Sequence, residues 1–254
     1  MFRDYNRKDI FQMDKAYNDH ISLYFCQKNK IAAFLLILLG VGIWAIGFSK
    51  KDIYIFIVVG GLFCTLGIWI FLKELHANVS GQEVDNYVLN YYKYFPLRER
   101  IYNYLELSEK DVEEKEAYSF YGYTTKPIYT EPLLRIDTND KKARASNIQI
   151  SYFMFDDEVL INYSQIKSLT DSEFREKKYV WSYRSIKYCE LSSVKKMCMT
   201  APGKNDDKEE GVFNVMTIID KDNLTYKFAF DERFEVSAKY ISKRIRKKIY
   251  LNID

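Results

Sequence analysis

The last helix predicted in this chain carries the side chains best suited to binding chemistry. Ammonium and guanidinium groups attract anionic surfaces, and near an anionic leaflet each contributes about 1 kcal/mol. A solvated helix face, with basic residues near the C-terminus complementing the helix dipole, accounts for the same pattern. We predict that the cluster binds anionic lipid or a protein partner, and we keep the solvated face as the alternative. Its six members are Lys239, Lys243, Arg244, Arg246, Lys247 and Lys248.

Three consecutive acids are the strongest candidates for catalytic or metal chemistry. Asp156, Asp157 and Glu158 lie at the break between two predicted strands, where acidic residues are typical of turns. We therefore predict a turn at this position. A site that combines Asp156, Glu158 and the distant Arg184 is the enzyme alternative, but we assign no residue as catalytic.

Metal ligands and catalytic nucleophiles follow no recognisable pattern in this sequence. His20 and His76 are the only histidines, and neither has Cys or carboxylate partners at metal-ligand spacing. No Gly-x-Ser-x-Gly elbow is present. We therefore expect no metal and no cofactor. The formal net charge of +3 is too small to predict nucleic-acid binding.

Two uncharged apolar runs dominate the first third of the chain. Residues 31–48 and 53–72 are each close to the ~20 residues that a helix needs to cross a bilayer. Only four residues separate them, so we predict a transmembrane hairpin over residues 31–72. A buried helical pair in a soluble protein is the alternative.

The lysines beside the two runs predict which way the hairpin faces. Cytoplasmic flanks carry an excess of Lys and Arg. Lys50 and Lys51 lie in the predicted turn, where long side chains snorkel to the headgroups at low cost. We predict a multi-pass protein of the cell membrane with both termini cytoplasmic, which makes residues 1–30 an N-terminal cytoplasmic segment. The lysines that favour this orientation are Lys15, Lys28, Lys30 and Lys73.

Small residues recur every seven positions in both runs. This interval keeps them on one seam of a left-handed helix pair, where close backbone approach favours packing. With the turn at Lys50 and Lys51, Gly40 is expected opposite Gly61. The alternative is that one seam faces a second copy of the chain. The predicted packing residues are Ala33, Gly40, Gly47, Gly60, Gly61 and Gly67.

The rest of the chain divides into a helical part and a strand-rich part. Residues 73–117 are predicted as a helical neck, with helices over 82–94 and 97–107 and a short acidic stretch over 108–116. Residues 118–254 alternate polar with β-branched and aromatic residues, which predicts strands followed by a C-terminal helix over 233–251. The apolar face of that helix is predicted from Val236, Tyr240, Ile241, Ile245 and Ile249. The strands are predicted at 133–137, 147–155, 158–163, 178–183, 188–191, 214–219 and 224–230.

The segments between these strands are predicted as turns and loops. Polar residues at 138–142, 156–157 and 220–223 are typical of short turns. The charged stretch over 203–211 is predicted as a solvated loop.

Strands in series closed by one helix predict an α+β fold, an antiparallel sandwich or partial barrel capped by the C-terminal helix. This order, over about residues 145–251, resembles the pleckstrin-homology-like domains that follow membrane hairpins in bacteria. Residues 179–187, Tyr-Val-Trp-Ser-Tyr-Arg-Ser-Ile-Lys, resemble the strand-then-turn segment of those domains. The whole layout, with residues 137–146 leading into the sheet, is also similar to two-span proteins of low-GC Gram-positive bacteria. The resemblance implies a scaffold that binds lipid, peptide or protein and carries no catalytic motif.

These observations predict a membrane-anchored binding or scaffold protein. Its cytoplasmic pleckstrin-homology-like domain would recognise protein or anionic lipid, so membrane lipids and a protein partner or second copy are the expected partners. One alternative is a homo-oligomeric structural membrane protein joined through the glycine seams and neck tyrosines. The other is the membrane-associated enzyme. The neck tyrosines are Tyr87, Tyr91, Tyr92, Tyr94, Tyr102 and Tyr104.

Overall fold

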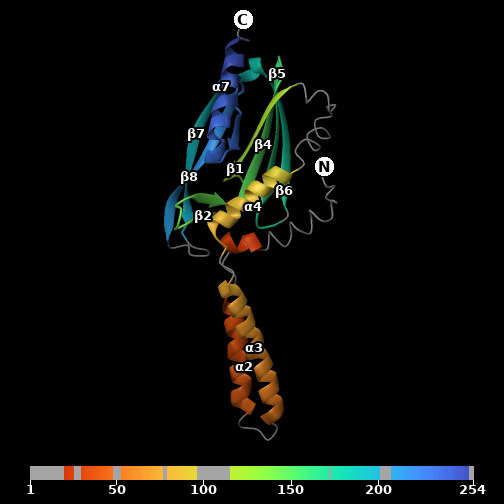
Figure 1. Cartoon of the computed structure of the whole chain (residues 1–254), viewed down its shortest axis with the longest axis vertical. Helices are drawn as coiled ribbons and strands as arrows, with labels where there is room; N and C mark the ends of the chain where they lie inside the picture. The colour runs from red at the N-terminus through yellow and green to blue at the C-terminus, as the bar shows by residue number, and fades with distance from the viewer. Residues whose placement is uncertain are drawn as a thin grey trace. The chain divides into compact units, whose positions relative to one another are not determined.

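A computed structural model describes residues 20–25, 30–47, 53–76, 79–95, 115–171, 173–200 and 207–251. The chain divides into two compact units (Figure 1). One is a helical unit, Cys26–Ser80, and the other is a β-rich unit made of Met1–Phe25 and Gly81–Asp254. The β-rich unit is therefore built from two stretches of chain on either side of the helical unit.

The helical unit is a pair of antiparallel helices, α2 (Lys30–Gly47) and α3 (Ile53–His76), which lie side by side (Figure 1). Small residues allow the close approach. A Cβ on Gly40 would lie 2.5 Å from Cys64 Sγ and 2.7 Å from the Gly60 carbonyl oxygen. A Cβ on Gly67 would lie 2.9 Å from the Ala33 carbonyl oxygen.

One predicted pairing in this seam is wrong by one residue. Gly40 meets Gly60 rather than Gly61, whose added Cβ would approach only the Trp44 ring, at 3.9 Å. A step of one residue turns a helix by about 100°, so Gly61 cannot share the face that Gly60 and Gly67 occupy. At the far end of the seam, Gly47 lies directly against Phe56.

Among the described residues, one helix is long and apolar enough to cross a membrane. It is the segment Tyr54–Leu72 of α3, with 19 residues, a mean hydropathy of 2.5 and only 17% of its window buried. The apolar part of α2, Ala33–Gly47, is shorter. Length and composition of this kind also occur in core helices of soluble proteins, so a two-span hairpin stays a prediction.

The β-rich unit contains two sheets, and its α+β class with mainly antiparallel sheets and a C-terminal helix agrees with the sequence prediction. Sheet A has the antiparallel order β1-β4-β5-β6 and sheet B the order β3-β2-β7-β8-β9, with β2 and β7 parallel. Sheet A consists of β1 (Glu116–Tyr123), β4 (Asn147–Phe155), β5 (Val159–Ser168) and β6 (Phe174–Ser182). Sheet B consists of β2 (Leu134–Ile136), β3 (Ala143–Ala145), β7 (Ile186–Met199), β8 (Lys208–Asp220) and β9 (Thr225–Ala229).

The core lies where the two sheets and the last helix, α7 (Glu235–Leu251), meet. Alternation along β4 sends Phe153 and Phe155 into this core. The opposite face of β4 is also buried, which explains why every residue of the strand is inaccessible to solvent. From α7, the buried members are Ala238, Ile241, Ser242 and Ile245.

Helix α4 (Gly81–Tyr94) covers the outer face of sheet A (Figure 1). The Tyr92 hydroxyl lies 2.6 Å from Ser119 Oγ of β1, and the Tyr91 hydroxyl donates to Gln165 of β5 at 3.2 Å. Val84 and Val88 are buried. The helix predicted over 82–94 therefore exists, but it belongs to the same compact unit as the sheets. The helix predicted over 97–107 lies outside the described part of the chain, as do residues 108–114 of the predicted acidic stretch. The last residue of that stretch, Glu116, begins strand β1.

Several strand boundaries differ from the predictions. Strands β1 and β3 were not assigned individually, and β7 and β8 extend further than the predicted segments. Part of the predicted loop over 203–211 is strand, because β8 begins at Lys208. Gly211 lies in that strand with no room for a side chain, since an added Cβ would lie 2.5 Å from Cys198 Sγ. The predicted turns at 138–142 and 156–157 are confirmed, since each separates two strands. The turn predicted at 220–223 begins one residue later, because Asp220 is the last residue of β8.

The apolar face predicted for α7 is wrong at two positions. Val236 is 81% exposed and Tyr240 is 43% exposed. Ala238 takes their place in the core, because it shares a face with Ile241 and Ile245. A short 3-10 turn, η2 (Glu232–Phe234), precedes α7 and shifts its start two residues beyond the predicted one.

Candidate functional site

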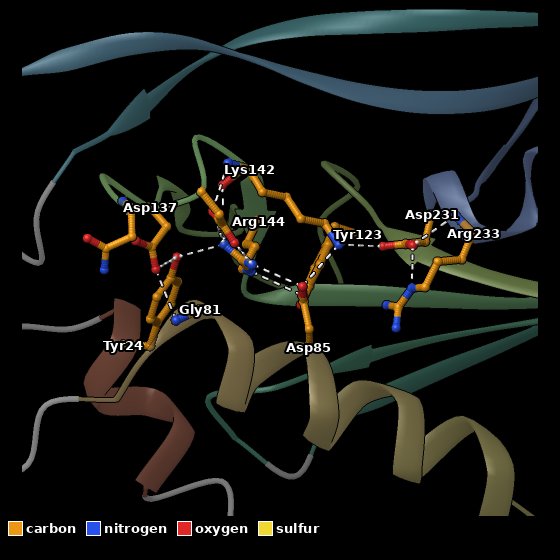
Figure 2. Close-up of polar contacts among 11 residues, drawn as sticks. Tyr24, Gly81, Asp85, Tyr123, Asp137, Lys142, Arg144, Asp231 and Arg233 are labelled. Carbon is orange, nitrogen blue, oxygen red and sulfur yellow. Dashed lines mark hydrogen bonds and ion pairs between the residues drawn. The ribbon is translucent and has the colours of Figure 1, made fainter.

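Arg144 of β3 is the centre of a buried ionic network (Figure 2). Its side chain is fully buried. It forms a bidentate ion pair with Asp85 of α4, in which Nε donates to Oδ1 at 3.0 Å and Nη2 donates to Oδ2 at 2.9 Å. The same guanidinium donates to both carboxylate oxygens of Asp140, at 3.1 and 2.5 Å. Arginine suits this role because its planar group presents several fixed donors.

The network stays ionised despite its burial. Burial pushes the pKa of Asp85 upward, but hydrogen bonds from Arg144 and Tyr123 and the nearby positive charges hold it below its usual value. Hydrogen bonds from Arg144 also lower the pKa of Asp140. For Arg144, burial opposes the charge, yet the hydrogen bonds to Asp140 and Asp85 raise its pKa further. Paired groups of this kind retain charges that would otherwise be too costly to bury.

Lys142 extends the network from α4 to the C-terminal region. Its ammonium lies 3.0 Å from Asp85 Oδ2 and 2.8 Å from Asp231 Oδ2. Asp231 also accepts from Arg233 Nε at 2.7 Å and from the Arg233 backbone N–H, which begins η2. The Tyr123 hydroxyl donates to Asp85 at 2.6 Å. The strand β1, the β2–β3 turn, α4 and the start of η2 are thus joined through one set of charges.

A single carboxylate oxygen at the other end of the network holds two distant stretches of chain (Figure 2). Asp137 Oδ2 accepts from the Gly81 backbone N–H at 2.9 Å and from the Tyr24 hydroxyl at 3.5 Å. A Cβ on Gly81 would lie 2.5 Å from this oxygen, so glycine permits the approach. Arg135 stacks its guanidinium 4.0 Å from the Tyr24 ring centre and donates to the Tyr24 carbonyl oxygen at 2.5 Å.

The contacts of Asp137 with Tyr24 and Gly81 involve the residues on either side of the helical unit in sequence. Tyr24 comes two residues before the helical unit and Gly81 directly after it. The two segments of the β-rich unit that precede and follow the helical unit in sequence are therefore both held at the β2–β3 region. Four carboxylates and four cations take part, so the charges are balanced and the arrangement is suited to holding structure. The carboxylates are Asp85, Asp137, Asp140 and Asp231, and the cations are Arg135, Lys142, Arg144 and Arg233.

Sequence reasoning missed this network. Residues 138–142 were predicted only as a polar turn, and Asp85 and Asp231 lie far from that turn in sequence. The available signal was the run Asp-Thr-Asn-Asp-Lys-Lys-Ala-Arg over 137–144, in which acids are followed closely by bases. That run does not reveal that Arg144 would be buried, because the cover comes from the helical turn over residues 20–25 and from α4.

A second group of cations lines a cavity of about 240 Å³ beside the outer edge of β9. Lys126, Lys196 and Lys227 contribute to its wall, together with Thr124 and Thr125. The lining includes no Asp or Glu. Lys126 is partly buried, and its ammonium donates to the Lys227 carbonyl oxygen. Burial, with the positive charges of Lys177 and Lys227 nearby, lowers the pKa of Lys126 to about 8.

The structure divides the predicted basic cluster on α7 into two sets. Arg244 pairs with Glu116 of β1, and Lys248 lies 3.3 Å from Asp157 in the β4–β5 turn. Arg246 donates to the Ser242 carbonyl oxygen at 3.4 Å. The other three lysines are exposed and repeat every four residues on one side of the helix, where Lys239 also pairs with Glu235. We call Lys239, Lys243 and Lys247 the α7 ridge.

The acids of the enzyme alternative lie on the surface of the β4–β5 turn. Asp156 pairs with Lys115 at 2.5 Å, and hydrogen bonding from that lysine lowers its pKa. Glu158 and Arg184 are exposed. The cavity beside β9 is lined by none of these three residues. Within the described part of the chain, no group of three or more His, Cys, Asp or Glu side chains is arranged to hold a metal ion.

Comparison of the chain with protein-family models, with curated proteins and with solved structures found no match. The function proposed below is therefore argued from geometry and charge. Three features carry that argument: the apolar helical unit, the balanced network around Arg144, and the two groups of unbalanced lysines on α7 and beside β9.

Proposed function

We propose that this chain is a bacterial membrane-anchored binding or scaffold protein. The hairpin of α2 and α3 anchors it in the cell membrane with both termini cytoplasmic. The β-rich unit, a pleckstrin-homology-like domain, recognises anionic lipid or a protein. The order of strands closed by a C-terminal helix supports the resemblance on which this assignment of the domain is based.

The observation that carries the proposal is the outward face of α3. Val58 is 62% exposed and Leu62 is 64% exposed, in the middle of a 19-residue apolar segment. The partner helix α2 also exposes large apolar side chains, among them Phe34 and Leu35. A soluble monomer rarely exposes so large a continuous apolar surface. A bilayer would remove this surface from water while the small-residue seam holds the two helices together.

The seam itself favours an anchor over an oligomer built through glycines. Gly40, Gly47, Gly60 and Gly67 all face the partner helix within the same chain. Packing within the hairpin therefore accounts for the small residues that the oligomeric alternative would use.

The α7 ridge supports binding to an anionic surface. Lys243 and Lys247 are exposed, and Lys239 makes only a surface ion pair with Glu235. An exposed pair of this kind contributes little stability, so it does not prevent binding elsewhere. Each lysine near an anionic leaflet contributes about 1 kcal/mol, and attachment through the hairpin raises the effective concentration of such a weak contact.

Substitution of one apolar residue tests the anchor. Leu62→Arg places a charge near the centre of the span, which costs about 2.5–3.5 kcal/mol, whereas Tyr54→Arg places it at the end, where arginine snorkels. We expect the unaltered chain and Tyr54→Arg to stay in the membrane pellet after alkaline carbonate extraction, and Leu62→Arg to be largely lost from it. Recovery of the unaltered chain as a folded monomer in the aqueous fraction, without detergent, would contradict the proposal.

Reconstitution in lipid nanodiscs tests the α7 ridge. We expect backbone hydrogen exchange over α7 to be slower in discs with an anionic phospholipid than in purely zwitterionic discs, because lipid contact protects the helix. The triple variant Lys239→Gln, Lys243→Gln and Lys247→Gln should lose this difference. A matched variant at three exposed lysines elsewhere, Lys178→Gln, Lys187→Gln and Lys221→Gln, should keep it. Equal exchange of the unaltered chain in both discs would favour the solvated face.

A further inference from the structure

We propose that the cavity beside β9 binds a phosphate group through Lys126, Lys196 and Lys227. The inference goes beyond the proposed function, because the cavity lies wholly within the β-rich unit and needs no membrane to fill it. It is based on the placement of the lysines, on the donors around them and on the missing negative charge.

The free edge of β9 forms one wall of the cavity and fixes Lys126 in place. The Lys227 carbonyl oxygen accepts from the Lys126 ammonium and, at 3.4 Å, from Gln149 Nε2. The Gln149 side-chain oxygen accepts from the Ala229 backbone N–H at 3.1 Å. The backbone edge is therefore satisfied by side chains from the neighbouring segments, and the Lys126 ammonium is held beside the cavity.

The charge in this cavity is unbalanced. An ammonium has three donors, and for Lys126 the hydrogen bond to the Lys227 carbonyl oxygen uses one. Burial already disfavours its charge, and Lys177 and Lys227 add repulsion. Because the lining contains three lysines and no carboxylate, an anion inside the cavity would relieve this repulsion.

The neighbouring hydroxyl groups and the charge favour phosphate over a carboxylate. A phosphate monoester carries about −1.5 to −2 charges at pH 7 and has three strong acceptor oxygens, whereas a carboxylate carries one charge. Thr124 Oγ1 accepts the Lys126 backbone N–H at 3.2 Å, so its own hydroxyl proton can be donated to a ligand. The volume of about 240 Å³ is several times the ~30 Å³ of a water molecule, which leaves room for a phosphate and part of its carrier.

Competitive acylation of lysines in the full chain tests the site. The chain is purified in maltoside micelles, which contain no phosphate, and labelling at Lys126 is measured by mass spectrometry against exposed Lys178. We expect inorganic phosphate at ten times its dissociation constant to slow labelling of Lys126 about tenfold, relative to sodium chloride at equal ionic strength. Equal labelling in phosphate and chloride, and with added phosphatidic acid, would overturn the proposal.

Two variants connect the protection to the cavity. The double variant Lys196→Met and Lys227→Met keeps Lys126 but should lose most of the protection. The control variant Lys221→Met, at an exposed lysine outside the cavity, should retain it. Both altered cavity lysines are exposed, and continued protection of the buried Cys189 thiol from alkylation shows that the fold is intact. Full phosphate protection in a folded double variant would overturn the assignment of these residues.

A further labelling experiment distinguishes a lipid headgroup from a soluble phosphate compound as the ligand. Protection by micelles containing phosphatidic acid, without free phosphate, would support a lipid headgroup as the ligand. Protection by inorganic phosphate alone would support a soluble phosphate compound. Either result stands even if the chain proves not to be membrane-anchored, so failure of the site and failure of the anchor are separable.

Discussion

The β-rich unit contains two groups of long basic side chains that differ in their partners. Around Arg144, three of the four cations, Lys142, Arg144 and Arg233, pair with carboxylates. The contact between Arg144 and Asp85 is bidentate. In the cavity beside β9, Lys126 faces a carbonyl oxygen and other lysines. The first group satisfies its charges within the protein, whereas the second leaves positive charge without a counterion among its lining residues.

This difference distinguishes charged side chains that stabilise the fold from charged side chains that are available to bind a ligand. Buried ions are retained at low cost only when partners and hydrogen bonds compensate the loss of water. The network around Arg144 meets that condition, and through Asp137 it joins two segments of the β-rich unit that are distant in sequence. Lys126, the partly buried lysine beside β9, does not meet it, so its charge is available to a ligand. Substitutions in the two groups should therefore have opposite consequences for stability.

The largest effect is expected from Arg144→Met. The substitution removes the guanidinium and leaves Asp85 and Asp140 without their main partner, which should lower the free energy of unfolding by about 3–5 kcal/mol. The measurement is the alkylation rate of the buried Cys189 thiol in the full chain, relative to the denatured chain. Arg184→Met, at an exposed arginine, is the control and should change it by no more than about 0.5 kcal/mol.

A second substitution separates the loss of the ion pair from a general defect in packing. Adding Asp85→Asn to Arg144→Met removes the uncompensated charge and should restore part of the lost stability. Equal stability of Arg144→Met and the unaltered chain would show that the network does not hold the unit together.

The sequence predicts the β-rich unit better than it predicts its ionic sites. Alternating polar and apolar residues over 147–151, followed by aromatic residues, predict β4 with its bounds. The turn at Asp156 and Asp157 follows from local chemistry alone. Local patterns of this kind act within a few residues, so a single sequence contains them.

The Arg144 network and the cavity beside β9 depend on contacts that are distant in sequence. Asp85 and Arg144 are separated by 59 residues. Lys126 and Lys227 are separated by 101 residues and come together only because the edge of β9 lies beside the chain that follows β1. The exposure of Val236 has the same origin, since the pairing of α7 with the sheets, and not its periodicity, determines which face is covered. Residue type alone could not distinguish lysines that pair with a carboxylate from lysines whose surroundings contain none.

A smaller effect on the free energy of unfolding is expected from Lys126→Met. The pH dependence of this effect shows whether the Lys126 ammonium is desolvated. The pKa of Lys126 is about 8 in the folded chain and 10.5 as its ordinary value. Between these values the unfolded chain binds more protons than the folded chain, so the contribution of Lys126 to stability rises with pH.

Below pH 8 Lys126 is protonated in both the folded and the unfolded chain, and the cost of burying its charge is at its maximum. The free energy of unfolding of the unaltered chain minus that of Lys126→Met should therefore increase by about 2 kcal/mol from pH 8 to pH 10 in phosphate-free buffer. Urea unfolding of both proteins at each pH measures this difference. The contributions of titratable groups that both proteins share cancel in the subtraction. A difference that stays constant over this range would mean that the Lys126 ammonium is fully hydrated, and the contrast between the two groups of cations would then fail at the cavity beside β9.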